Sequence, residues 1–300
     1  MTVIFISPVA ITDSVFVSST RAENDYTAWS GATTYAAGDR CILVSTHRIY
    51  QSVQAGNLNH DPATDAGTWW VAIGATNRWC MFDQSVGSVT SQATPLTVVL
   101  HPGDITASLA LLDLDGTSVD VSMTDGLAGP SVYSKSYDIT DDATLASWWD
   151  YFFAPLTPAT TLIVNDLPAY SNGYVSVTIN AATTARCGTM VVGNGVEVGS
   201  LRAGVQVGII DYSKKTTDDY GVTSILERAF AKRIEADVLI TNAQLDYIST
   251  KFAEIRAIPV VWSFDSAYDC LQVYGWVKDW SATIIYRDYS EKRLTIEGLV

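Results

Sequence analysis

The sequence predicts a mainly β protein built from several domains, and three observations support this. The chain has 300 residues, which is more than one compact domain usually holds. Hydrophobic residues make up 48% and charged residues 17%, so the chain can bury sizeable cores. Short runs of alternating apolar and polar residues recur between Gly, Pro, Asn and Asp, which is typical of strands joined by turns.

Residues 75–193 show this pattern most clearly, and we expect a β-sandwich there. Turn-forming pairs such as Pro102-Gly103 and Asn172-Gly173 separate the apolar runs. The strands predicted in this region are residues 96–100, 108–114, 118–123, 132–137, 174–179 and 189–192.

Within the sandwich, residues 140–153 predict one helix. Thr140 or Asp141 can cap its first turn, and the apolar residues that follow have helical spacing. We interpret this apolar stripe as core; it consists of Leu145, Trp148 or Trp149, and Phe152.

Residues 194–300 predict a β-sheet with one helix packed against it. Residues 227–240 alternate between apolar and polar to their end, which favours a strand. A helix is the alternative, because Ser224 and Glu227 have the spacing of a capping box. Further strands are expected at residues 260–264, 271–278, 280–287 and 293–299.

The helix expected in this region covers residues 242–256 and begins at Thr241 or Asn242. Pro259 follows its end and cannot continue it. The apolar stripe that would pack on the sheet consists of Leu245, Ile248, Phe252 and Ile255.

Residues 1–24 predict an N-terminal docking segment with a strand at residues 3–6. No basic residue precedes this short apolar run, so we do not expect a secretion signal. No stretch approaches the roughly 20 apolar residues that a membrane helix requires, so we expect no membrane span.

The net charge of −14 is unevenly distributed. Residues 1–193 hold 6 Lys and Arg against 17 Asp and Glu, whereas residues 194–300 hold 12 against 15. A surface this acidic repels phosphate backbones, which argues against sequence-specific binding of nucleic acid. The nearly balanced last third can supply both signs of charge to a protein–protein contact.

The chain carries no recognisable catalytic motif, and we expect neither enzymatic activity nor a cofactor. None of the three histidines has a second histidine at metal-ligand spacing. The four cysteines lie far apart, so we expect isolated thiols rather than a disulfide framework or a zinc site. Nucleotide-binding, hydrolase and metalloprotease signatures do not occur.

Residues 25–74 are dense in aromatic and turn residues. They contain Trp29, then Tyr35-Ala-Ala-Gly38-Asp39, then Tyr50, then Trp69-Trp70 shortly before Gly74. This order resembles the type 3 chitin-binding module of chitinases, which implies a small β module whose aromatics supply much of its burial. Where sugar-binding members of that family carry a Trp pair, this sequence reads Ser52-Val53-Gln54. The residues expected either to bind a glycan or to form the module's core are Trp29, Tyr35, Tyr50 and Trp69.

The other two regions also carry resemblances. Residues 75–193 open with Trp79-Cys-Met-Phe82 and close with the runs 175–179 and 188–193, whose pairing resembles that in a galactose-binding-like jelly roll. The last third is similar to the β-rich domain of phage distal tail proteins in its strand, its helix, and the Pro259-Val-Val-Trp262 that follows.

Together the resemblances imply a structural protein of a bacteriophage tail tip or baseplate, assembled in the host cytoplasm and carried in the virion. The expected partners are tail-tube and tail-tip hub proteins, further copies of this chain in a symmetric ring, and host cell-surface polysaccharide. Residues 194–300 and the N-terminal strand would dock into that assembly, while the two acidic domains project outward. The alternative is a glycan-binding adhesin that uses the aromatic module and the jelly roll.

Overall fold

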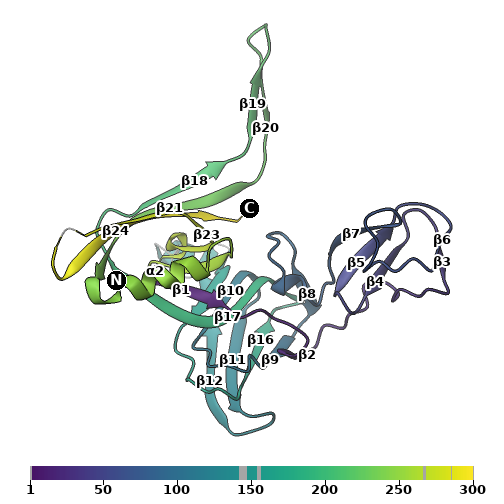
Figure 1. The fold of residues 1–300 in the computed structure, drawn as a ribbon, viewed down its shortest axis with the longest axis horizontal. Coiled ribbons are helices and arrows are strands. Elements are labelled where there is room, and N and C mark those ends of the chain that lie inside the picture. The colour runs from purple at the N-terminus through teal and green to yellow at the C-terminus, as the bar shows by residue number, and fades with distance from the viewer. Residues whose placement is uncertain (1, 142–146, 154–156, 266–267, 285, 300) are drawn as a thin grey trace.

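A computed structural model describes residues 2–141, 147–153, 157–265, 268–284 and 286–299. The chain is mainly β, as the sequence predicts, and forms a small module, a sandwich, a larger sheet and a projecting hairpin (Figure 1). Two α-helices, α1 (Trp148–Phe153) and α2 (Leu245–Glu254), and three short 3-10 turns complete the described part of the chain.

The largest sheet has ten strands and contains both the start and the end of the chain. In spatial order its strands are β15 (Thr161–Val164), β10 (Ser108–Asp115), β17 (Thr184–Leu201), β1 (Thr2–Pro8), β22 (Val260–Ser263), β23 (Gln272–Thr283), β24 (Tyr289–Gly298), β21 (Phe230–Thr241) and β18 (Gln206–Asp211), with β8 (Thr90–Ala93) beside the first part of β17. The N-terminal strand β1 therefore pairs on both edges within its own chain.

Six of these strands close into a ring, which we call the barrel. The end of β17 pairs with β21 through Ser200–Leu239 and Leu201–Val238, and this joins β17, β1, β22, β23, β24 and β21 in a circle. Helix α2 continues from a 3-10 turn, η2 (Asn242–Gln244), and packs on the barrel core. Residues buried in that core include Val3, Phe5, Val198, Ile234, Val238, Ile248, Phe252, Trp262, Leu294 and Ile296.

The sandwich forms where a second sheet faces β10, β15 and the first half of β17. This five-stranded sheet has the order β12 (Ser131–Asp138), β11 (Ser118–Asp125), β16 (Gly173–Asn180), β9 (Leu96–Leu100) and β2 (Phe16–Ser19). Every second residue of a strand points to the same face of its sheet, and the inward-facing residues of both sheets meet in a common core. The core includes Leu96, Leu109, Val121, Val177, Met190 and Val192.

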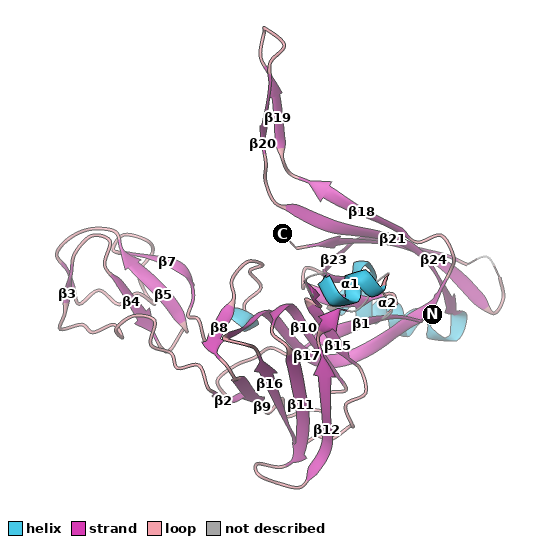
Figure 2. Cartoon of the chain, turned by 180° about the vertical axis from the view of Figure 1, so that it is seen from behind, coloured by secondary structure: helices cyan, strands magenta, loops and turns pink. Residues whose placement is uncertain are grey.

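The module is inserted between β2 and β8 and lies at one end of the molecule (Figure 2). It has a three-stranded sheet of β4 (Arg40–Leu43), β5 (Arg48–Ser52) and β7 (Trp70–Ala75), and a two-stranded one of β3 (Thr34–Tyr35) and β6 (Asn57–Leu58). A 3-10 turn, η1 (Cys80–Phe82), follows as the chain returns to the sandwich. The module's own core is small and mostly aromatic, as its size requires.

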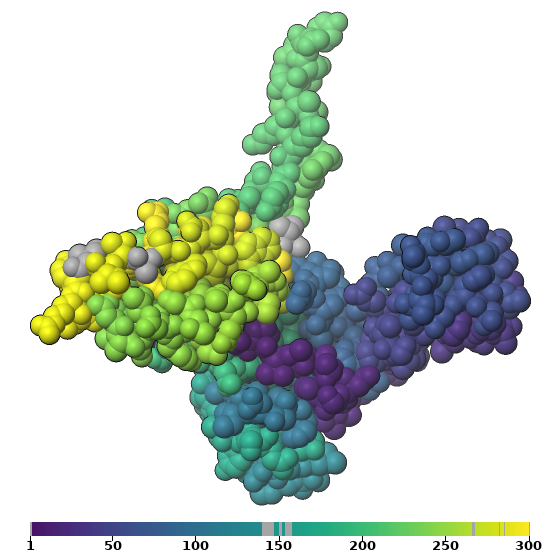
Figure 3. Space-filling view, in the orientation of Figure 1, coloured from purple at the N-terminus to yellow at the C-terminus, as the bar shows by residue number. Residues whose placement is uncertain are grey.

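Between β18 and β21 the chain leaves the sheet as a hairpin of β19 (Lys214–Thr217) and β20 (Thr223–Leu226). We call residues 212–229 the arm. It projects away from both cores (Figure 3), and every residue from Lys214 to Ala229 is exposed.

Most strands and the main helix predicted from the sequence are confirmed. All six strands expected in residues 75–193 are present, although the last is part of the much longer β17. Residues 230–241 form a strand, β21, with Ile234, Ala236, Val238 and Ile240 buried on one face. The helix expected at residues 242–256 is present as η2 and α2, and it ends at Glu254.

The helix expected at residues 140–153 is wrong over its first part. Residues 140–141 form a two-residue strand, β13 (Thr140–Asp141), paired with β14 (Thr157–Pro158), and helix α1 begins only at Trp148. The interpretation of its aromatics as core is also wrong, because Trp148 and Trp149 are 80% and 70% exposed. The predicted core residue Leu145 lies outside the described residues.

Three further expectations need correction. The strands expected at 271–278 and 280–287 are one strand, β23, with a register shift against β24 between Val277 and Asp279. The runs 175–179 and 188–193 do not pair, because β16 and β17 lie in opposite sheets. Strand β17 crosses the expected boundary at 193/194 without interruption, so the sandwich and the barrel share one strand.

The close approach of β1 and β17 predicts a strict requirement for glycine at position 193. A Cβ on Gly193 would lie 1.9 Å from the backbone oxygen of Ser7, so Gly193→Ala must push the two strands apart. We expect the free energy of unfolding to fall by about 1–3 kcal/mol, the usual cost of overpacking. Gly208→Ala is the matched control, because nothing lies within 4 Å of its Cβ position. Denaturant titration of both variants measures the difference; equal stabilities would contradict the packing described for β1.

Lys292 of β24 predicts a pH-dependent stability. Its side chain is fully buried, its Nζ lies 3.8 Å from the ring centroid of Trp280, and no hydrogen-bond partner for Nζ occurs in the described residues. Desolvation lowers the pKa of Lys292 from 10.5 to about 8. The unfolded chain therefore binds the proton more tightly, so the free energy of unfolding should rise between pH 8 and 10.5.

The deprotonation of Lys292 should raise the free energy of unfolding by up to about 3 kcal/mol in total. Lys292→Met should remove this rise and increase the stability at pH 7. Lys214 is exposed, so the control variant Lys214→Met should show the same rise with pH as the unmodified chain. Denaturant midpoints measured at pH 7 and pH 10 test this. An identical pH profile in Lys292→Met and the unmodified chain would contradict it.

Candidate functional site

Two of the four aromatic residues predicted for the module are core. Tyr35 and Tyr50 are only 6% and 9% exposed, and they pack with Cys41 and Trp70. The hydroxyl of Tyr35 accepts a hydrogen bond from the backbone N–H of Ser30 at 2.9 Å. Neither ring is available to stack on a ligand.

Trp29 and Trp69 are partly exposed. Both pack on the edge of the module's core, and the indole of Trp69 is stacked against His60 at a centroid distance of 4.0 Å. Trp70, which we did not single out from the sequence, is 2% exposed and occupies the core. Trp70 is the first residue of strand β7, whose sequence does not alternate between apolar and polar residues, so no local pattern distinguished it from Trp69.

His47 joins the module to the rest of the chain. It lies in the turn between β4 and β5 and stacks on Trp79 at a centroid distance of 3.9 Å. Its Nε2 lies 2.8 Å from a carboxylate oxygen of Asp13, and its Nδ1 lies 3.1 Å from one of Glu23. Both carboxylates come from the segment before the module, so one ring is held from three sides.

Additional hydrogen bonds join the chain's entry into the module to its exit. Glu23 also accepts a hydrogen bond from the hydroxyl of Thr76 at 2.9 Å. Asp25 accepts one from the backbone N–H of Asn77 at 2.8 Å and pairs with Arg21 at 2.6 Å. Because these contacts tie both connections to each other, the module is held in one orientation on the sandwich.

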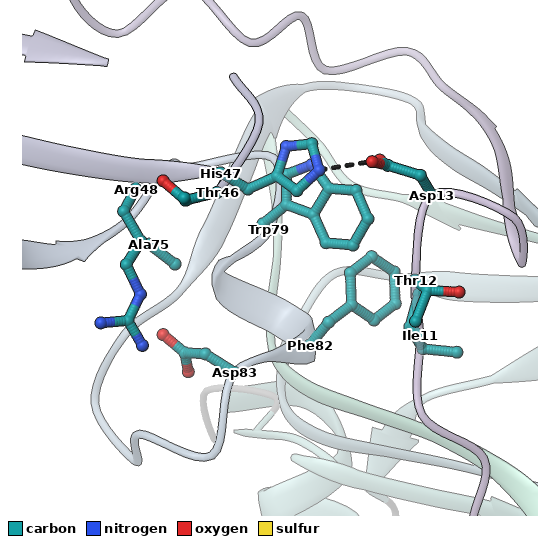
Figure 4. A pocket seen from close by; sticks show the side chains of 10 residues that line it. All are labelled: Ile11, Thr12, Asp13, Thr46, His47, Arg48, Ala75, Trp79, Phe82 and Asp83. Atoms are coloured by element: carbon teal, nitrogen blue, oxygen red, sulfur yellow. Dashed lines mark hydrogen bonds and ion pairs between the residues drawn. The ribbon is translucent and has the colours of Figure 1, made fainter. Parts of the chain in front are cut away.

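The same junction contains an open cleft of about 320 Å³ (Figure 4). Arg48 and Asp83 lie on one side and Asp13 on the other, with Trp79 and Phe82 between them. Carboxylates and a guanidinium can hydrogen-bond a polar ligand. Trp79, however, is only 7% exposed beneath His47, so its ring face is not free for stacking on a sugar.

The arm is exposed over residues 214–229 without interruption. It has no core of its own, because both of its strands are exposed along their whole length. It nevertheless carries large apolar side chains, together with those on β18 and at the start of β21. With their exposed fractions these are Val207 (47%), Ile209 (66%), Tyr212 (47%), Tyr220 (93%), Val222 (64%), Ile225 (64%), Leu226 (57%) and Phe230 (57%).

The described residues offer little that points to metal chemistry or to a membrane. In this part of the chain no three His, Cys, Asp or Glu side chains cluster so that they could hold a metal ion. None of its helices is long and apolar enough to cross a membrane. All four cysteines are free thiols, as expected.

Comparison with known proteins leaves the family open. No protein-family model and no curated protein matches the chain. The function must therefore be argued from the surfaces described above.

Removal of the His47 ring should loosen the module without unfolding it. In His47→Ala the contacts to Asp13, Glu23 and Trp79 are lost, whereas the core of the module is untouched. We expect a wider distribution of distances between spin labels at Ala55→Cys and Ser134→Cys, with exposed Cys270 replaced by Ser. His60→Ala is the control, because His60 stacks within the module. An unchanged distance distribution in His47→Ala would show that the His47 contacts do not fix the module's orientation.

Proposed function

We propose that this chain is a structural protein of a bacteriophage tail tip or baseplate, which assembles with other tail proteins through its arm and carries its aromatic module outward. The observation that carries the proposal is the arm. A two-stranded hairpin is at best marginally stable alone in water, and this one exposes Tyr220, Ile225 and Leu226. Such a hairpin gains stability when a partner covers its apolar side chains.

The edge of the sheet beside the arm supports assembly as well. Strand β18 is the last in the order of the large sheet, and among the described residues only β21 pairs with it. Its outer edge leaves backbone N–H and C=O groups free to pair with a strand of another subunit. Lys214, Lys215 and Asp219 provide both signs of charge on the adjoining arm, which suits a contact between proteins.

The position of the module agrees with an outward role. It lies at a different end of the molecule from the arm (Figure 3), so a subunit held by its arm can leave the module uncovered. The alternative function, a glycan-binding adhesin, has less support because Tyr35 and Tyr50 are buried and Trp69 is covered on one face by His60. In this proposal, contact with a host polysaccharide is a secondary role of the module and not the main function of the chain.

Shortening the arm should abolish assembly and leave the fold intact. Asp211 and Phe230 are register partners at the base of the arm, so an Asn-Gly turn can replace residues 212–229 and close β18 onto β21. In a phage that encodes this chain, we expect particles that lack a functional tail tip. Deletion of residues 25–74 is the matched control and should leave tails assembled.

Mass spectrometry and negative-stain microscopy of purified particles measure both outcomes. Infectious particles that still contain the shortened chain at its normal copy number would rule out the arm as the assembly surface. Absence of the unmodified chain from purified particles would rule out the virion assignment altogether.

A further inference from the structure

The tip of the arm holds one tyrosine in a rigid, exposed position. The carboxylate of Asp218 accepts hydrogen bonds from the backbone N–H groups of Tyr220 at 3.0 Å and Val222 at 2.8 Å. A backbone hydrogen bond closes the same turn: the N–H of Asp218 donates to the carbonyl oxygen of Val222 at 3.0 Å, and Gly221 adopts a φ of 81°. Tyr220 is therefore fixed at its backbone while its side chain is 93% exposed. Such a preorganised aromatic is the usual anchor of a protein–protein contact.

A pocket of about 440 Å³ lies near the base of the arm, where the barrel meets the sandwich. Its lining residues come from strands of the sandwich and of the barrel, together with Val86 and Gly87 from the loop before β8. Lining side chains include Leu112, Phe230, Val273, Tyr274 and Leu299, with Asp113 and Lys232 as the charged groups. The volume is large enough to hold one aromatic side chain together with its neighbour.

The chemistry of the tip complements that of the pocket. Asp219 and Tyr220 are adjacent at the tip and offer a carboxylate and a phenol. The pocket offers the ammonium of Lys232 to pair with a carboxylate, and the carboxylate of Asp113 to accept a hydrogen bond from a phenol O–H. Apolar walls at Leu112 and Phe230 suit the tyrosine ring.

The tip cannot fill the pocket of its own chain. Tyr220 is separated from Phe230, which lines the pocket, by a strand that runs away from the sheet (Figure 1). At about 3.3 Å per residue of extended strand, the tip lies on the order of 20–30 Å from that pocket. A tip that occupies such a pocket must therefore belong to another molecule.

We propose that the arm of one copy inserts Tyr220 into this pocket of a second copy, with Asp219 pairing with Lys232. This inference rests on the proposed assembly function and names the partner of the arm. Donor and acceptor are different surfaces of one chain, so the contact is head-to-tail. Repeated head-to-tail contacts close into a ring or extend as a filament.

A mixing experiment tests the contact directly. A tip variant, Asp219→Ala with Tyr220→Ala, keeps an intact pocket, and a pocket variant, Lys232→Glu, keeps an intact tip. We expect each alone to self-associate at least about tenfold more weakly than the unmodified chain, because a central anchor or its charge partner is lost. Mixed in equal amounts they should form a 1:1 dimer and nothing larger, since only one complete contact remains.

Sedimentation velocity on the full chain measures these species, and circular dichroism checks the fold of each variant. Arg256→Glu is the control for the change in charge, because Arg256 is exposed on the chain after α2 and does not line the pocket. Self-association of Lys232→Glu at the unmodified level, absence of the mixed dimer, or an unmodified chain that stays monomeric up to its solubility limit would each overturn the contact. Loss of tails on shortening the arm would still stand in those cases, so the proposed function is tested separately.

Discussion

Strand β17 is the element on which the rest of the structure depends. Its first half pairs with β10 and places Met190 and Val192 in the sandwich core, and its second half pairs with β1 and places Val196 and Val198 in the barrel core. On the other face of the sheet, Ile6, Ala110, Val191 and Val261 come from four neighbouring strands and pack together. Since two cores and a third cluster share one hydrogen-bonded strand, the sandwich and the barrel cannot separate without breaking its ladder.

The surfaces on which the proposed function rests lie at the margins of this shared core. The module is attached through the His47 contacts on one side, and the arm leaves the barrel between β18 and β21 on another. A stiff centre fixes the distance and direction between these two surfaces. A subunit built in this way can transmit the geometry of an assembly to a module at its periphery, which a flexible linker could not do.

The sequence predicts local structure well here because strands and helices leave a periodic trace. The alternation of residues 230–241 and the stripe of Ile248 and Phe252 each correspond to an observed buried face. Trp148, Trp149, Phe152 and Phe153 of α1 are exposed although the stripe had helical spacing, because spacing shows which residues share a face but not whether another element covers that face. Pairing partners leave no such trace, so the sharing of β17 and the position of β1 between β17 and β22 were not predicted.

The candidate surfaces were predicted only in part. Four aromatic residues of the module were named, but the core residue Trp70 was not, because Trp69 and Trp70 are adjacent and no periodic pattern at the start of β7 separates them. The arm was not predicted, although Lys214–Thr217 and Thr223–Leu226 flank a turn containing Tyr220-Gly221 and could have indicated a hairpin. Its isolation from every core is a tertiary property that no local pattern carries.

Native-state hydrogen exchange along β17 tests most directly whether the sandwich and the barrel are one cooperative unit. If they are, the amides of residues 189–192 and 196–200 exchange with the same free energy of opening, close to that of global unfolding. Two clearly different opening energies on either side of Gly193, with a separate unfolding transition for each half, would contradict it.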